Sequence, residues 1–91
     1  MNRKRDRLEV IHDILKAVQE SGNSIKPTPL LRKSNLSSQS FSEYFPDLLT
    51  KGFVKELSDK KGKKRITLTD RGFHYLEKYR AFKGFIDEFE L

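Results

Sequence analysis

The sequence predicts an α+β fold that is mostly helical and carries one short β-hairpin. Two observations predict it. Several segments repeat apolar residues at the spacing of an α-helix, and two strand-like runs flank a lysine-rich turn between Gly52 and Gly72. With 91 residues, the chain is expected to fold around a single small core.

The first helix is expected over residues 6–20, because its apolar residues recur at helical spacing. These residues are Leu8, Ile11, Ile14, Leu15 and Val18. Gly22 and Asn23 should end the helix, since both residue types readily adopt the left-handed conformation found at helix C-termini. A very short strand is expected over residues 24–26, because Pro27 favours an extended residue before it.

A short second helix is expected from Pro29 to about Lys33, with Thr28 as its N-cap and Pro29 in the first helical position. After a tight turn, Ser37 or Ser38 should cap a third helix that extends to residue 51. Its apolar stripe consists of Phe41, Tyr44, Phe45, Leu48 and Leu49. Pro46 interrupts this stripe and should kink or break the helix, because it cannot donate a hydrogen bond to Ser42.

The hairpin follows, with Phe53, Lys55 and Leu57 alternating before the turn and Ile66 and Leu68 after it. Gly62 can supply the positive φ that a short loop commonly needs. Residues 59–65 hold five basic residues and one acid, a net charge of +4. The turn is therefore either a solvated loop or a surface for a polyanion.

Thr69 is expected to cap a long last helix whose Phe73 and Leu76 face the core. From residue 75 onward, apolar residues are spaced four, three, four and three apart, which is typical of a helix-pairing surface. This C-terminal stripe consists of Tyr75, Tyr79, Phe82, Ile86 and Phe89. It predicts a homodimer joined through residues 75–91, and the alternative is that the helix folds back onto the first helix.

The order of these elements is that of a winged helix-turn-helix, which we expect over residues 1–74. In that fold the second helix of the helix-turn-helix enters the DNA major groove, and the hairpin, or wing, reaches the backbone or minor groove. The same order excludes a Rossmann unit.

Three segments carry a resemblance: LEVIHDILKAVQ, SQSFSEYFPDLLTKGFV and ITLTDRGFHYLEKY. They resemble small archaeal winged-helix DNA-binding proteins that are regarded as transcriptional regulators. The most specific part runs from Tyr44 to Val54 and continues at residues 68–72. The resemblance implies DNA binding through the third helix and the wing and, in some members, dimerisation through a long C-terminal helix.

The residues themselves also predict contact with double-stranded DNA. No acidic residue lies between Glu20 and Glu43, and the hydroxyl and basic groups in this interval are donors suited to phosphate. The candidates in the turn and third helix are Arg32, Lys33, Ser37, Ser38, Gln39, Ser40 and Ser42. Gln39 could instead read adenine, but the third helix has no arginine for guanine, so most of the affinity should come from charge.

Two further basic groups extend this surface. The wing candidates are Lys60, Lys61, Lys63, Lys64 and Arg65. The basic start of the chain is either a minor-groove arm or a solvated tail, and its members are Arg3, Lys4, Arg5 and Arg7. The net charge of +6 suits a polyanionic partner.

Other classes of function find little support. The absence of cysteine excludes disulfides and thiolate zinc sites, and neither His12 nor His74 lies in a cluster with metal-ligand spacing. No nucleotide-binding loop or nucleophile motif is present, so we expect no enzyme activity, metal or cofactor. No apolar run is long enough to span a membrane, and a cytoplasmic protein is expected.

The sequence thus favours a DNA-binding transcriptional regulator. Three alternatives stay open: a general DNA-coating chromatin protein, a protein-interaction module on a winged-helix scaffold, and an RNA-binding protein.

Overall fold

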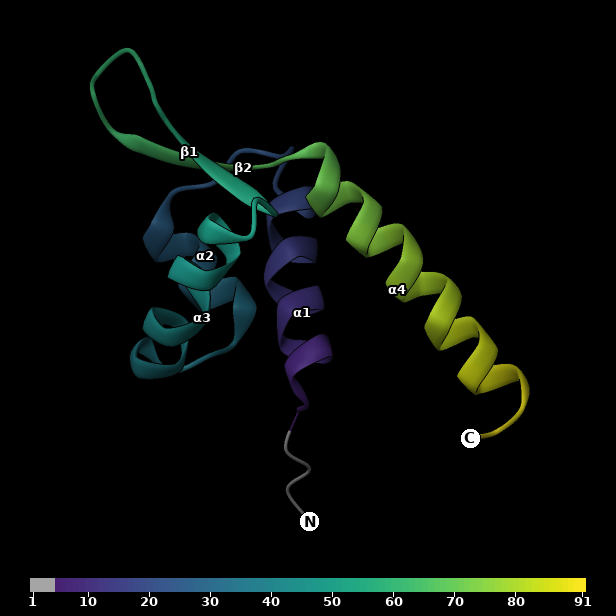
Figure 1. Ribbon diagram of the computed structural model, residues 1–91. Helices are drawn as coiled ribbons and strands as arrows, with labels where there is room; N and C mark the ends of the chain where they lie inside the picture. Colours follow the sequence, from purple (N-terminus) through teal and green to yellow (C-terminus); the bar gives the residue numbers. More distant parts are fainter. Residues whose placement is uncertain (1–4) are drawn as a thin grey trace.

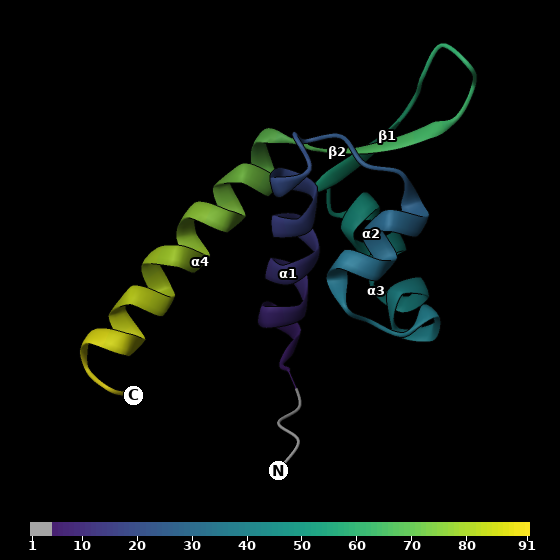
Figure 2. The same cartoon turned by 180° about the vertical axis from the view of Figure 1, so that it is seen from behind.

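The computed structural model describes residues 5–91, which form four helices and one antiparallel hairpin (Figure 1). The elements are α1 (Arg7–Glu20), α2 (Pro27–Ser34), α3 (Ser38–Thr50), β1 (Val54–Ser58), β2 (Lys64–Leu68) and α4 (Asp70–Glu88). α2, α3 and the hairpin lie on one side of α1, and α4 lies on the other (Figures 1 and 2). The predicted fold class and order of elements are confirmed.

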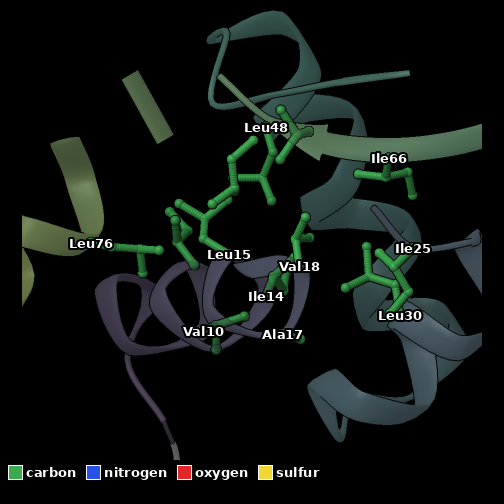
Figure 3. Close-up of a cluster of buried hydrophobic side chains, with 13 residues drawn as sticks. Val10, Ile14, Leu15, Ala17, Val18, Ile25, Leu30, Leu48, Ile66 and Leu76 are labelled. Carbon is green, nitrogen blue, oxygen red and sulfur yellow. The ribbon is translucent and has the colours of Figure 1, made fainter. Parts of the chain in front are cut away.

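The core is built around α1, whose Ile14, Leu15 and Val18 are completely buried. Buried side chains from every other element surround them (Figure 3). They are Ile25, Leu30, Leu48, Val54, Ile66, Leu68 and Leu76. Leu8, which was expected on the same apolar stripe, is half exposed because it lines an open depression beside Tyr79 and Phe82 of α4.

The end of α1 connects directly to the sheet. Asn23 adopts a positive φ of 59°, and its side-chain Oδ1 accepts a hydrogen bond of 2.7 Å from the backbone N–H of Leu68. Ile25 then pairs with Ile66 through two backbone hydrogen bonds of 3.1 and 2.8 Å. The short strand predicted over residues 24–26 is thus present as a single bridge.

α2 begins at Pro27, so the prediction that it begins at Pro29 is wrong. Lys26 is the N-cap and makes no side-chain capping bond, and Thr28 lies within the helix. The fixed φ of proline suits the first turn of a helix, and both Pro27 and Pro29 have it. The helix can therefore begin at Pro27, the earlier of the two in the chain. Asn35 ends α2 in the left-handed conformation and turns the chain towards α3.

α3 starts as predicted, with the Ser37 hydroxyl accepting from the backbone N–H of Ser40 at 3.1 Å. Of the kink or break expected at Pro46, the break is absent, because the helix continues to residue 50. Pro46 is exposed, while Leu48 after it is completely buried and the rings of Phe41 and Phe45 stack before it. Packing on both sides therefore outweighs the one backbone hydrogen bond that proline removes.

The hairpin pairs Val54 with Leu68 and Ser58 with Lys64. Its root is buried and its tip projects away from the core (Figure 1). Gly62 has a φ of 77°, which confirms the left-handed turn expected there.

Asp59 organises the tip of the hairpin. Its Oδ1 accepts hydrogen bonds of 2.9 Å from the backbone N–H groups of Lys61 and Lys63, and its own N–H donates to the carbonyl of Lys63 at 2.8 Å. The backbone hydrogen bond from Lys63 is the largest of the effects that lower the pKa of Asp59, and the charges of Arg65 and Lys26 add to it. The one acid in the basic turn thus fixes the backbone from which the lysines project.

The start of α4 is joined to the root of the hairpin. Thr69 caps α4 by accepting from the N–H of Gly72 at 3.1 Å, and its hydroxyl donates to the carbonyls of Gly52 and Phe53. Gly72 lies so close to this segment that a Cβ there would meet the Phe53 carbonyl oxygen at 2.3 Å. α4 can therefore approach β1 only with glycine at this position.

This contact sets the rotation of α4. Gly72 and Leu76, four residues apart, are both buried and define the face that meets the core. Phe73 lies about 100° round the helix from Gly72 and is 39% exposed, so its predicted place in the core is wrong.

We predict that Gly72→Ala destabilises the fold by about 1–3 kcal/mol, because the added methyl group forces α4 away from the Phe53 carbonyl. Chemical denaturation of both proteins measures the difference. Gly84→Ala is the matched control, since nothing lies within 4 Å of its added Cβ. Gly84→Ala should be neutral or stabilise the fold by up to about 1 kcal/mol. Equal effects at the two glycines would contradict the close approach of Gly72 to Phe53 as the cause of the destabilisation.

A second prediction concerns the turn. Asp59→Ala should remove the protection of the Lys61 and Lys63 amides from hydrogen exchange while leaving the amides of α1 protected. The folded-state pKa of Asp59 lies below its ordinary value of 3.8, so the carboxylate stabilises the turn above that value, and this is lost as the pH falls through the lowered pKa.

An NMR pH titration of the Lys61 and Lys63 amides tests whether the turn loses stability as the pH falls. The control Asp59→Asn keeps an oxygen acceptor but has no titrating group, so its turn should show no such acid transition. An identical transition in both proteins would assign it to another group.

Candidate nucleic-acid interface

The lysines of the hairpin form an exposed basic surface. Lys60, Lys61 and Lys63 are exposed on the turn whose backbone Asp59 holds. Lys64 is the first residue of β2, and its Nζ lies 4.0 Å from Oε2 of Glu56. Arg65 follows and is half-buried. The positive charges of Arg65 and of Lys26, the N-cap of α2, both help to lower the pKa of Asp59.

The two predicted residues of α2 differ in whether their side chains are already engaged within the domain. Arg32 and Lys33 are both exposed in the last turn of α2. The Nζ of Lys33 donates a hydrogen bond of 2.9 Å to the hydroxyl of Ser21, at the end of α1. The side chain of Arg32 makes no hydrogen bond or ion pair within residues 5–91, and it is the more available of the two.

The N-terminal half of α3 presents small polar side chains to solvent. Ser38, Gln39 and Ser42 are exposed, and Ser40 is partly buried beside the Ser37 cap. The hydroxyl of Ser42 donates to the carbonyl of Ser38 at 2.8 Å. Gln39 therefore has the longest side chain available at the start of α3, where recognition helices contact base edges.

The arginines at the start of the chain bind other parts of the same domain. Arg5 pairs with Asp13 at 2.6 Å and also donates to the carbonyls of Ser34 and Asn35 at 3.2 and 2.9 Å. It therefore joins α1 to the turn between α2 and α3. The other two members of the proposed arm, Arg3 and Lys4, lie outside the described residues.

Arg7 makes a similar connection to α3, through a hydrogen bond of 2.6 Å to Asp47. Lys51 lies 3.1 Å from the same carboxylate. The hydrogen bond from Lys51 is the main cause of a lowered pKa of Asp47, and the charges of Lys51 and Arg7 add to it. Arg5 and Arg7 thus neutralise acids within the domain. The sequence had predicted that both belong to a minor-groove arm or to a solvated tail.

The C-terminal stripe is divided in two by the structure. The Tyr75 hydroxyl donates to the Leu8 carbonyl at 2.6 Å, and burial raises its pKa to about 12. Tyr79 stacks on His12 with 4.2 Å between the ring centroids. These two residues face α1, as they would in the fold-back alternative.

The second half of α4 diverges from α1 (Figures 1 and 2). Its phenylalanines Phe82, Phe85 and Phe89 are 49, 56 and 57% exposed, and the last two rings are 5.1 Å apart. Phe85 was not part of the predicted stripe. It could have been found in the sequence as the residue that lies one helical turn before Phe89.

Two other residues were not among the candidates predicted from the sequence. Asp59 is the only acid in the basic turn and precedes Gly62 by three residues, a pattern typical of a side chain that bonds to its own turn. Glu43 ends the acid-free interval and is exposed on α3.

The remaining surface features are modest. An open groove of about 490 Å³ runs between α1 and α4 and contains side chains of both charges, among them Asp13, Lys16 and Arg80. None of the helices that the structure describes has both the length and the apolar character needed to cross a membrane. Within residues 5–91, no three histidine, aspartate or glutamate side chains gather into a group that could hold a metal ion.

Solved structures with the same fold include two DNA-binding proteins. Sso10a-2, described as a DNA-binding protein from Sulfolobus solfataricus, superposes with a TM-score of 0.78 at 15% identity, over 94% of this chain and 86% of its own. F93 from STIV, described as a winged-helix DNA-binding protein, gives a TM-score of 0.71 at 20% identity, over 87% and 90% of the two chains.

A relative in sequence is an uncharacterized protein of Methanocaldococcus jannaschii, 38% identical over 69 residues, which are 76% of this chain. The present chain spans 64% of the length of that relative. A family model described as winged helix-turn-helix matches residues 4–86. Since this match covers most of the sequence and the structure has the same fold, the chain belongs to the winged helix-turn-helix family.

Proposed function

We propose that this protein binds double-stranded DNA and regulates transcription, with α3 in the major groove and the wing, residues 54–68, on the backbone or in the minor groove. The observation that carries the proposal is that the basic wing and the polar start of α3 lie on the same side of α1 (Figure 1). The descriptions of Sso10a-2 and F93 as DNA-binding proteins support it. Family membership also favours a protein that is not an enzyme.

The chemistry of this side suits a phosphate backbone. Lysine side chains, serine hydroxyls and the free N–H groups at a helix N-terminus all donate to phosphate oxygens. Two acids on the same side, Asp47 and Asp59, are already engaged by Lys51, Arg7 and backbone amides. The charge of Asp47 is therefore balanced by two cations, and five basic residues outnumber Asp59 within residues 59–65.

The affinity is expected to depend strongly on salt, because bound lysines displace condensed counterions from DNA. If the wing, α2 and the helix-turn-helix neutralise roughly six phosphates, log K should fall with log salt at a slope of about −5. Arg5 and Arg7 are engaged within the domain, so the wing should supply most of these contacts.

We predict that changing Lys60, Lys61, Lys63 and Lys64 together to Ala weakens duplex binding and reduces the salt slope from about −5 to about −2. Fluorescence anisotropy with a labelled random duplex at several salt concentrations measures both quantities. The control is Lys16→Glu combined with Arg71→Glu, which changes two exposed cations outside the wing, α3 and the basic middle of α4. Both variants lower the net charge by four, so an equal loss of binding would show that only net charge matters.

We further propose that the protein forms a homodimer through the outer half of α4, the predicted stripe being modified to include Phe85. Three phenylalanines, each about half exposed, lie on one side of the outer half of α4, which diverges from α1 (Figure 1). They form an apolar surface of the kind that mediates association. Ile86 borders them and is partly buried. The inner residues Tyr75 and Tyr79 would instead hold α4 against α1.

The charges of α4 favour a second copy in antiparallel orientation as the partner. The middle of α4 is basic, with Lys78, Arg80 and Lys83, whereas its end is acidic, with Asp87 and Glu88. An antiparallel second copy places the acidic end of each helix beside the basic middle of the other, whereas a parallel copy places like charges together.

We predict that Phe82→Ser, Phe85→Ser and Phe89→Ser combined convert a dimer of chains of about 10.7 kDa each into a monomer, as measured by sedimentation equilibrium. Phe73→Ser is the matched control, because Phe73 is exposed on a different face of α4 and should leave the dimer intact. A wild-type chain that stays monomeric at high micromolar concentration would remove the proposal.

A further inference from the structure

The outward face of α3 carries a row of residues that the charge-based account of binding does not use. Gln39, Glu43, Pro46 and Thr50 are spaced four, three and four residues apart and are all exposed. This spacing places them in one line along the helix, opposite the buried Leu48. Glu43 is the charged member of this row.

Glu43 differs from the other acids in its part of the chain. Residues 36–68 contain four acids: Glu43, Asp47, Glu56 and Asp59. Asp47 pairs with Arg7 and Lys51, Glu56 lies 4.0 Å from Lys64, and Asp59 accepts from backbone amides. For Glu43, the part of the chain that the structure describes provides no ion pair or hydrogen bond to its side chain.

The nearest candidate partner is already engaged elsewhere. Arg7 lines the same shallow depression as Glu43, together with Tyr44 and Asp47, but its guanidinium donates to Asp47 at 2.6 Å. The carboxylate of Glu43 therefore keeps its acceptor capacity on the face that α3 turns to solvent.

A free carboxylate on this face opposes binding to phosphate but can recognise one base. Cytosine presents an amino donor, N4–H₂, in the major groove, and carboxylates accept from it, whereas guanine presents only acceptors there. The unfavourable charge is thus compensated only where a cytosine amino group is within reach.

We propose that Glu43 is a specificity-determining residue that selects a C·G pair by accepting from cytosine N4, an inference that rests on the proposed binding of α3 in the major groove. Gln39 lies one turn closer to the N-terminus, about 6 Å along the axis, and its amide can bond adenine bidentately. The two side chains together favour duplexes with an adenine one or two steps from the cytosine.

The test is selection of bound duplexes from a random library by the wild-type chain, by Glu43→Gln and by Glu77→Gln. The wild type should enrich a C·G pair at one fixed position, by about tenfold over other pairs. Glu43→Gln should lose this preference, or move it towards A·T, while binding random duplexes at least as tightly. Glu77→Gln removes the same charge from an exposed position on α4, across α1 from α3, and should keep the preference.

The outcomes separate this inference from the function on which it rests. Salt-dependent binding by the wild type without enrichment of a C·G pair, or enrichment that survives Glu43→Gln, would overturn the role of Glu43 and leave DNA binding intact. A wild-type chain that binds no duplex would overturn both. Circular dichroism of the variants verifies that the exposed substitutions preserve the fold.

Discussion

The burial of one helix, α1, supports every other part of this small domain. Ile14, Leu15 and Val18 have no exposed surface, and full burial of such a side chain contributes about 1.5–3 kcal/mol. α2, the hairpin and α4 all contact α1, while their contacts with one another are fewer. The wing continues from the root of β2, and the outer half of α4 continues from its first half, and both of these parts contact α1. The proposed DNA-binding and dimer surfaces therefore both depend on α1.

The sequence predicted those features that are set within a few residues. The caps at Ser37 and Thr69 and the left-handed Gly62 follow from local hydrogen bonding and backbone preference. The continuity of α3 through Pro46 could not be predicted in this way, because it depends on packing around Leu48. The rotation of α4, which exposes Phe73, likewise depends on a contact with the carbonyl of Phe53, nineteen positions before Gly72 in the chain.

The candidate site shows the same limit of local reasoning. The basic turn and the polar start of α3 could be found from composition and spacing. The different uses of the arginines could not, since the partners of Arg5 and Arg7 lie 8 and 40 residues away and become neighbours only in the fold. For the same reason, the contrast between the engaged Asp47 and the unengaged Glu43 requires the structure, although the two carboxylates are one helical turn apart in sequence.

The close junction of Gly72, Thr69 and Phe53 has a geometric consequence for an assembled protein. Because the cap of α4 bonds to the root of the hairpin, the wing and the long helix are held in a fixed relation to each other. In the dimer proposed above, a two-fold axis across the outer half of α4 would then determine the separation of the two wings. The spacing between the half-sites of a palindromic operator would be set by this junction and by the length of α4.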